Sequence, residues 1–179
     1  MAQASIIKDK QGDIIEVDNV SGAIATENQW QALLESGKLF TVSHVELAVT
    51  NATSLFALIT VGAIPIHIGF RAEGTGETDI RVREGVVASG NGTPLVSVNR
   101  NRASAITSST ALFIAPTITT AGTIMLDEIL ALAGARETRD GFEFILAAST
   151  NYTIELNNIS GGNEDVALVV DWFEDPSLV

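Results

Sequence analysis

The segment "IPIHIGF" (residues 64–70) alternates apolar residues with other residues at a period of two. Such alternation is typical of a strand with one face in a core and the other towards solvent. His67 falls on the second face, followed by Arg71. We expect the apolar face to be buried; its members are Ile64, Ile66, Ile68 and Phe70.

The same period recurs towards the C-terminus, in "FEFILAA", "NYTIELNN" and "VALVVDWFED". Each of these segments places its larger apolar residues on one face, which predicts further half-buried strands. Together with the first segment they predict one shared core. From these three segments we assign to it Phe144, Leu146, Ile154, Leu168, Val170 and Trp172.

The composition favours strands throughout. Ile, Thr and Val number 18, 17 and 15, so 50 of the 179 residues are β-branched, and such side chains suit a pleated, half-buried surface. Turn residues recur every eight to twelve positions and no helical pattern follows Gly37. Eight or nine short strands with this spacing predict an all-β protein, an antiparallel β-sandwich of jelly-roll type.

Several segment boundaries follow from the pattern. We expect strands at 40–49 and 78–84, and two strands within 55–70 joined by a turn near 61–63. Dense turn residues predict a turn at 89–94, and the charged segment 133–141 is expected to be an exposed loop.

The first 38 residues differ from the rest and are interpreted as an N-terminal arm, with the sandwich domain at 39–179. A polar turn between two isoleucine pairs predicts a short hairpin, and "TENQWQALLESGK" predicts one short helix that starts with a capping box and stops at Gly37. A helix of about ten residues is marginal alone and must dock. The candidate contact residues of the arm are Ile6, Ile7, Ile14, Ile15, Trp30, Leu33 and Leu34.

Charge and cysteine content exclude several classes of partner. The net charge is −12 with only ten Lys and Arg, which argues against nucleic acid and against an anionic membrane surface. The absence of cysteine excludes disulfides and thiolate chemistry. No secretory signal is visible, so we expect a soluble protein made in a cytoplasm.

The sequence holds no recognisable catalytic motif, and we expect no enzyme activity, cofactor or metal. A metal site of the cupin kind needs clustered histidines beside a carboxylate, whereas His44 and His67 stand apart in separate strands. A cupin-like metalloenzyme therefore stays a minor alternative. Acidic pairs such as Glu174–Asp175 are expected by chance in a chain with 22 acids.

Positive charge is concentrated in "VNRNRAS" (residues 98–104), where Asn99, Arg100, Asn101 and Arg102 alternate. If the segment is extended, the two arginines share one face. If it leaves the strand, guanidinium groups suit carbonyls or carboxylates in planar, bidentate contacts. We expect a loop clamp or a contact between subunits, with a site for a ligand anion as the alternative.

The order of "GTPLVSVNRNRAS", "PTITTAGTIMLDE" and "ILAASTNYTIELNNISGGNEDVALVVDWFED" resembles a family of small virion proteins of tailed bacteriophages, known as decoration, cement or head-fibre proteins. The resemblance covers residues 40–175 and departs from the family pattern at Phe173, where tyrosine is usual. It implies a jelly-roll protein, commonly a homotrimer, on the capsid exterior of a virion. Its partner would be the major capsid protein, which it stabilises by bridging subunits, and the arm would anchor it or exchange with a neighbour.

A carbohydrate- or receptor-binding module of a phage tail or fibre is the alternative, because jelly rolls bind sugars on many unrelated proteins. Such a module usually exposes aromatic rings for stacking on a glycan, and this chain has one Tyr and two Trp.

Overall fold

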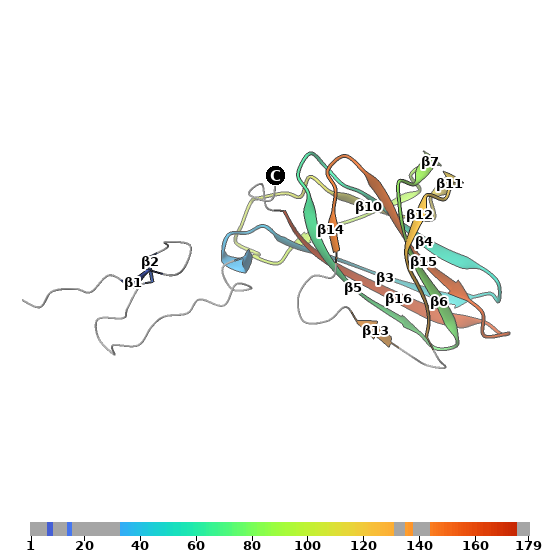
Figure 1. Ribbon diagram of the computed structural model, residues 1–179. Helices are drawn as coiled ribbons and strands as arrows, with labels where there is room; N and C mark the ends of the chain where they lie inside the picture. Colours follow the sequence, from blue (N-terminus) through green and yellow to red (C-terminus); the bar gives the residue numbers. More distant parts are fainter. Residues whose placement is uncertain (1–6, 9–13, 16–32, 131–134, 138–143, 175–179) are drawn as a thin grey trace, which may run out of the picture.

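A computed structural model describes residues 7–8, 14–15, 33–130, 135–137 and 144–174, with side chains at 33–130 and 144–174. Most of this part is strand, with almost no helix, and every pairing is antiparallel. Two six-stranded sheets pack face to face, as Figure 1 shows. The predicted antiparallel β-sandwich is confirmed. No helix in the described part is long and apolar enough to cross a membrane.

The first sheet has the order β12-β6-β15-β4-β10-β8. Its strands are β12 (Thr123–Leu130), β6 (Thr78–Glu84), β15 (Asn151–Asn158), β4 (Ser54–Thr60), β10 (Ala111–Ile114) and β8 (Thr93–Leu95). The second sheet has the order β13-β5-β16-β3-β9, with β14 also paired to β5. Its strands are β13 (Ala135–Glu137), β5 (Ile66–Gly74), β16 (Glu164–Glu174), β3 (Leu39–Val49), β9 (Val98–Asn99) and β14 (Phe144–Leu146).

The described chain also contains two smaller, two-stranded sheets. β7 (Val87–Gly90) pairs with β11 (Thr117–Thr120), and β1 (Ile7–Lys8) pairs with β2 (Ile14–Ile15), which is the hairpin predicted for the arm. Successive strands from β3 to β6 alternate between the two main sheets. After the inserted strands β7 to β11 the alternation resumes from β12 through the short strands β13 and β14 to β15 and β16. This alternation supports the jelly-roll interpretation, which stays an interpretation. The described strands of the sandwich begin at Leu39, and the boundary at residue 38 stays a prediction.

The core lies between the two sheets and matches the sequence pattern at most positions. Of the ten predicted core residues, eight are buried, whereas Ile64 and Phe144 are half-buried; Phe144 packs against the edge of the core. Trp172 is fully buried and stacks on Phe40 with ring centroids 5.7 Å apart. Burial of such large aromatic side chains dominates the stability of a core.

Tyr152 brings a polar group into this core. Its hydroxyl donates to Glu84 Oε1 at 2.8 Å and accepts from the N–H of Ala147 at 2.9 Å. Burial raises the pKa of Tyr152 to about 12, so the phenol keeps its proton and remains a donor across the physiological range.

Two loop predictions need correction. Residues 89–94 are not one turn: β7 and β8 occupy most of the segment, and the chain turns at Asn91–Gly92. Within the predicted loop 133–141, Ala135–Glu137 is strand β13, which pairs with β5. Cross-strand pairing outweighed the local turn and charge signals at both places, because a ladder satisfies backbone groups that a loop leaves to water.

The close backbone contact at the Gly92 turn can be tested by comparing substitution of Gly92 with substitution of Gly161. Gly92 and Gly161 both have positive φ, +87° and +84°, but a Cβ at Gly92 would lie 2.2 Å from the carbonyl oxygen of Ile114, whereas nothing lies within 4 Å of one at Gly161. We expect Gly161→Ala to cost about 1 kcal/mol, the ordinary penalty for a left-handed residue. Gly92→Ala should cost clearly more in urea denaturation. Equal losses would contradict the close approach at Gly92.

Candidate functional site

Three segments that are distant in the sequence meet at one end of the sandwich, where the arm joins it. They are the helical turn and its exit at 33–38, the segment 98–110, and the end of β16 at 172–174 (Figure 1). We call this group of residues the arm base. Residues 33–35 are helical, Gly37 has φ +69°, and the N–H of Gly37 donates to the carbonyl of Leu34. The predicted helix end at Gly37 is thereby confirmed.

Asn99 connects two of these segments. Its Nδ2 donates to the carbonyl oxygens of Gly37 at 2.7 Å and Ile106 at 2.9 Å. Its Oδ1 accepts from the N–H of Asn101 at 2.9 Å, which turns the chain out of β9. One amide thus satisfies three backbone groups that no ladder reaches, and buried backbone groups left unpaired are costly.

Asn101 repeats the arrangement one step further along. Its Nδ2 donates to the carbonyl of Glu35 at 3.2 Å, and its Oδ1 accepts from the N–H of Ala103 at 3.1 Å. The loop packs so closely on the arm that a Cβ at Gly37 would lie 2.3 Å from Ser104 Oγ. The two asparagines therefore fix the segment 98–104 to the last residues before β3.

Glu174, at the end of β16, holds the other half of the loop. Its carboxylate accepts from Ser108 Oγ at 2.6 Å, Ser109 Oγ at 3.1 Å and the N–H groups of Ser109 and Thr110 at 2.9 and 3.1 Å. Ser108 Oγ also accepts from Trp172 Nε1 at 3.1 Å. Glu174 is buried, and four donors around a buried carboxylate offset the cost of removing it from water. The acidic pair Glu174–Asp175, interpreted as chance, includes an anchor of the fold.

The two arginines of the segment contribute less. The chain leaves the strand after Asn99, so Arg100 and Arg102 are not on one face of a strand. Arg100 lies 3.6 Å from Asp171, with both side chains well exposed, and an ion pair of this kind contributes little. Arg102 is exposed and makes no ion pair within the described residues. Within the described chain the loop clamp is made by Asn99 and Asn101, which alternate with the arginines; the other role expected of the arginines, a contact between subunits, stays a prediction.

The predicted contact residues of the arm are placed only in part. Leu33 is half-buried and Leu34 is exposed at the arm base, where Val98 and Ile106 are also exposed. Ile7, Ile14 and Ile15 lie in the hairpin β1–β2, while Ile6 and Trp30 lie outside the described residues. The arm base thus presents apolar side chains around a frame fixed by hydrogen bonds.

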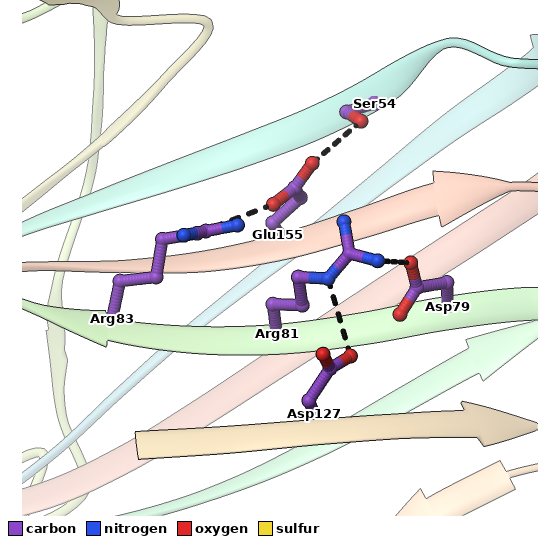
Figure 2. Close-up of polar contacts among 6 residues, drawn as sticks. All are labelled: Ser54, Asp79, Arg81, Arg83, Asp127 and Glu155. Carbon is purple, nitrogen blue, oxygen red and sulfur yellow. Dashed lines mark hydrogen bonds and ion pairs between the residues drawn. The ribbon is translucent and has the colours of Figure 1, made fainter. Parts of the chain in front are cut away.

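A second polar group lies on the outer face of the first sheet, away from the core. Figure 2 shows Arg81 between Asp79 and Asp127: its guanidinium pairs with Asp79, and its Nε lies 3.1 Å from Asp127 Oδ1. Beside them, Arg83 lies 3.6 Å from Glu155 Oε2, and Ser54 Oγ donates to Glu155 Oε1 at 2.9 Å. Strands β4, β6, β12 and β15 supply this network, which cross-links their outer face.

Asp79 is the member of this network that is least well compensated for burial. Its side chain is only 6% exposed, and its Oδ1 has no hydrogen-bond partner within the described residues. Burial raises the pKa of Asp79; the charge of Arg81 opposes the rise, and Asp127 and Glu155 add to it. The neighbouring arginine nevertheless makes the network suited to holding strands together rather than to binding a cation.

The two histidines have local contacts instead of a shared site. His44 Nε2 lies 3.1 Å from Glu46 Oε2 on β3, and the ring of His67 stacks on Phe173 with centroids 4.4 Å apart. Across the described ranges, no three His, Asp or Glu side chains are grouped to hold a metal ion. Neither histidine therefore brings the donor set of a cupin centre.

Sequence reasoning missed Glu174 and the Ser108–Thr110 segment that surrounds it. A sequence such as "SST" can surround a carboxylate, because hydroxyl and backbone N–H groups converge where a chain bends. No spacing rule connects it to a glutamate that is 64 residues away or more. The two meet only in the folded sandwich, where β3 pairs with β16 on one side and with β9 on the other, and the chain then crosses from β9 to β10 in the first sheet.

No protein-family model matches the chain, and no curated protein matches it. A solved chain of the infectious bursal disease virus Gx strain shows 9% identity and a TM-score of 0.18, covering 78% of this chain and 43% of that one. A chain of T=1 particles derived from infectious bursal virus shows 13% identity and a TM-score of 0.18, covering 92% and 45%. This chain spans less than half the length of these viral chains, and similarity at this level carries no argument about function.

The arm base predicts a large loss of stability for one substitution and almost none for a nearby one. Asn99→Ala removes three hydrogen bonds to backbone groups and should lower the free energy of unfolding by about 2 kcal/mol, because those groups lose partners. Arg102→Ala should change it by less than about 0.5 kcal/mol, as is usual for an exposed side chain. Urea denaturation measures both. A larger loss for Arg102→Ala than for Asn99→Ala would contradict this assignment.

The raised pKa of Asp79 predicts that its contribution to the free energy of unfolding depends on pH. Its ordinary pKa is 3.8 and the folded-state pKa is higher, so its titration stabilises the fold below 3.8 and this contribution is lost as pH rises through the folded-state value. Asp79→Asn has no such titration. The free energy of unfolding of the wild type, minus that of the variant, should therefore be larger at about pH 3.5 than at about pH 7. A difference that is independent of pH, or that falls on acidification, would show that the pKa is not raised.

Proposed function

We propose that this chain is a non-enzymatic structural protein of a virion, which decorates the outside of a bacteriophage head and bridges capsid subunits. The observation that carries the proposal is the arm base: a rigid, hydrogen-bonded end of the sandwich from which an N-terminal arm departs, surrounded by the exposed apolar side chains of Leu34, Val98 and Ile106. A protein that works by attachment needs such a fixed platform, since ordering a loop upon binding would cost affinity.

The composition supports the same proposal. An acidic chain with few cations suits a protein surface as partner better than a nucleic acid or an anionic membrane. The sequence resemblance to phage decoration proteins supplies the capsid exterior as the location, the major capsid protein as the partner and three copies as the expected assembly. The arm base is the surface we assign to the capsid and to the three-fold contact, with Asn99 and Asn101 in supporting positions.

The glycan-binding alternative has less support. Trp172 and Tyr152 are fully buried in the core, so neither ring is a platform on which a sugar could stack. Nothing in the described part of the chain favours a sugar over a protein partner.

Binding to capsids tests the proposal. Heads assembled from the major capsid protein of the parent phage, without this chain, should bind the purified protein to saturation in co-sedimentation, and electron cryo-microscopy should show the added density outside the shell. Removal of residues 1–32 should abolish binding and leave the fold intact. The cut spares residues 33–38 because the carbonyls of Glu35, Gly37 and Lys38 bond to the sandwich.

Two surface substitutions distinguish specific binding through the arm base from nonspecific adsorption to the capsid. Ile106→Asp places a charge at the arm base and should weaken capsid binding strongly, whereas Ile145→Asp, at another exposed apolar residue on β14, should leave it unchanged. Failure of the intact protein to bind these heads, together with selective binding to a glycan array, would replace the proposal with the glycan-binding module.

A further inference from the structure

One side of β3 is open for part of its length. β16 pairs with β3 along one side from Leu39 to Val49, but on the other side β9 pairs only with Phe40 and Thr41. No other strand of the described chain pairs with β3 there. At the far end, Ala48 has φ +55° and donates its N–H to Asp165 Oδ1 at 2.8 Å, which ends the regular strand. The open edge is therefore the segment 43–47.

The backbone groups that face this edge can be identified. The carbonyl of Leu39 accepts from the N–H of Arg100 at 2.9 Å, so Leu39 points its polar groups towards β9 and away from β16. These groups alternate from side to side along a strand. Ser43, Val45 and Leu47 therefore direct three N–H and three C=O groups to the open edge, and no backbone partner within the described chain meets them.

The side chains of the edge do not protect it. Val45 and Leu47 are 58% and 68% exposed, and the segment 43–47, "SHVEL", contains neither lysine nor proline. Proteins usually block an edge strand with such residues, because an open edge pairs with another strand. An exposed edge with apolar side chains is a binding surface for an extended segment.

We propose that this edge binds a second copy of this chain through antiparallel pairing of β3 with the partner's β3, about a two-fold axis at Val45. In this register Val45 lies opposite the partner's Val45, and Ser43 lies opposite the partner's Leu47. All six polar groups of each edge then find a partner, since directly opposite residues that face each other exchange two hydrogen bonds. The exposed apolar side chains of both copies gather on one face.

The charges of the edge fit the same register. His44 lies opposite the partner's Glu46 and Glu46 opposite the partner's His44, so the carboxylates are separated and each faces an imidazole. Within one chain His44 Nε2 already lies 3.1 Å from Glu46 Oε2, and pairing extends this contact across the axis. A two-fold axis at His44 instead would place His44 opposite itself and leave Leu47 unpaired. The edge is self-complementary in one register, as a two-fold interface requires.

This contact is separate from the arm base and does not depend on the proposed function. A two-fold contact gives assemblies with an even number of copies. The chain would form a dimer by itself, or a hexamer if the three-fold contact expected at the arm base also forms.

A cysteine variant tests the register. The chain has no cysteine, so Val45→Cys introduces a single thiol, and two such thiols lie opposite each other only if the axis passes Val45. Val87→Cys is the matched control, because Val87 is a strand valine of similar exposure, 52%. Under mild oxidation Val45→Cys should form a disulfide-linked dimer on the order of tenfold faster than the control, since pairing raises the local thiol concentration. Equal rates would overturn the proposal.

The number of copies in the solution assembly tests the proposed contact without cross-linking. Sedimentation of the full chain up to millimolar concentration should show an even number of copies. Val45→Lys should abolish this association with an unchanged melting temperature, because two ammonium groups would meet at the axis, whereas Val87→Lys should behave like the wild type. A monomer or a trimer at the highest concentration, or association that Val45→Lys leaves intact, would overturn the two-fold pairing whether or not capsid binding is found.

Discussion

Strand β16 is the element on which the rest of the structure depends, because it is paired along both sides. It bonds to β3 on one side and to β5 on the other, and it contributes Trp172 and Val170 to the core. Its last described residue, Glu174, then collects four donors from the segment 108–110. One strand therefore takes part in cross-strand pairing, in core packing and, through Glu174, in the hydrogen bonds to the segment 108–110. Because Glu174 is fixed by the sheet, the sheet also determines where this loop of the arm base lies.

The sequence was most informative where one periodicity dominates. Alternation in 64–70 and 166–175 predicted which faces are buried, because a side chain in a sheet has only two directions. It could not predict that β13 joins β5, or that 89–94 is mostly strand, because pairing across the fold decided both. Ile64 failed as a core residue for a related reason: it precedes the first residue of β5, so the pleat no longer directs its side chain.

The candidate segment was found by its composition, but within the described chain its clamp is made by other residues than the arginines. The alternation of Asn and Arg drew attention to 98–104, and charge suggested that the arginines were the clamp. An amide is better suited to this place, because it both donates and accepts and can therefore satisfy carbonyls and N–H groups of an irregular chain. Asn99 does both, whereas a guanidinium could only donate. Glu174 was out of reach for any local pattern, since its donors belong to a distant segment.

The distribution of positive charge connects the fold to the kind of partner. Arg71, Arg81, Arg83 and Arg100 each lie within ion-pair distance of a carboxylate of the same chain. The net charge of the protein is −12. Because most cationic side chains of the described sandwich are already paired within the chain, few of them are free to bind an anionic partner. With 22 Asp and Glu against ten Lys and Arg, what remains at the surface for recognition is unpaired carboxylates, exposed apolar side chains and open backbone edges. Contacts of that kind are weak individually and become strong only by repetition, as many copies on a regular surface provide.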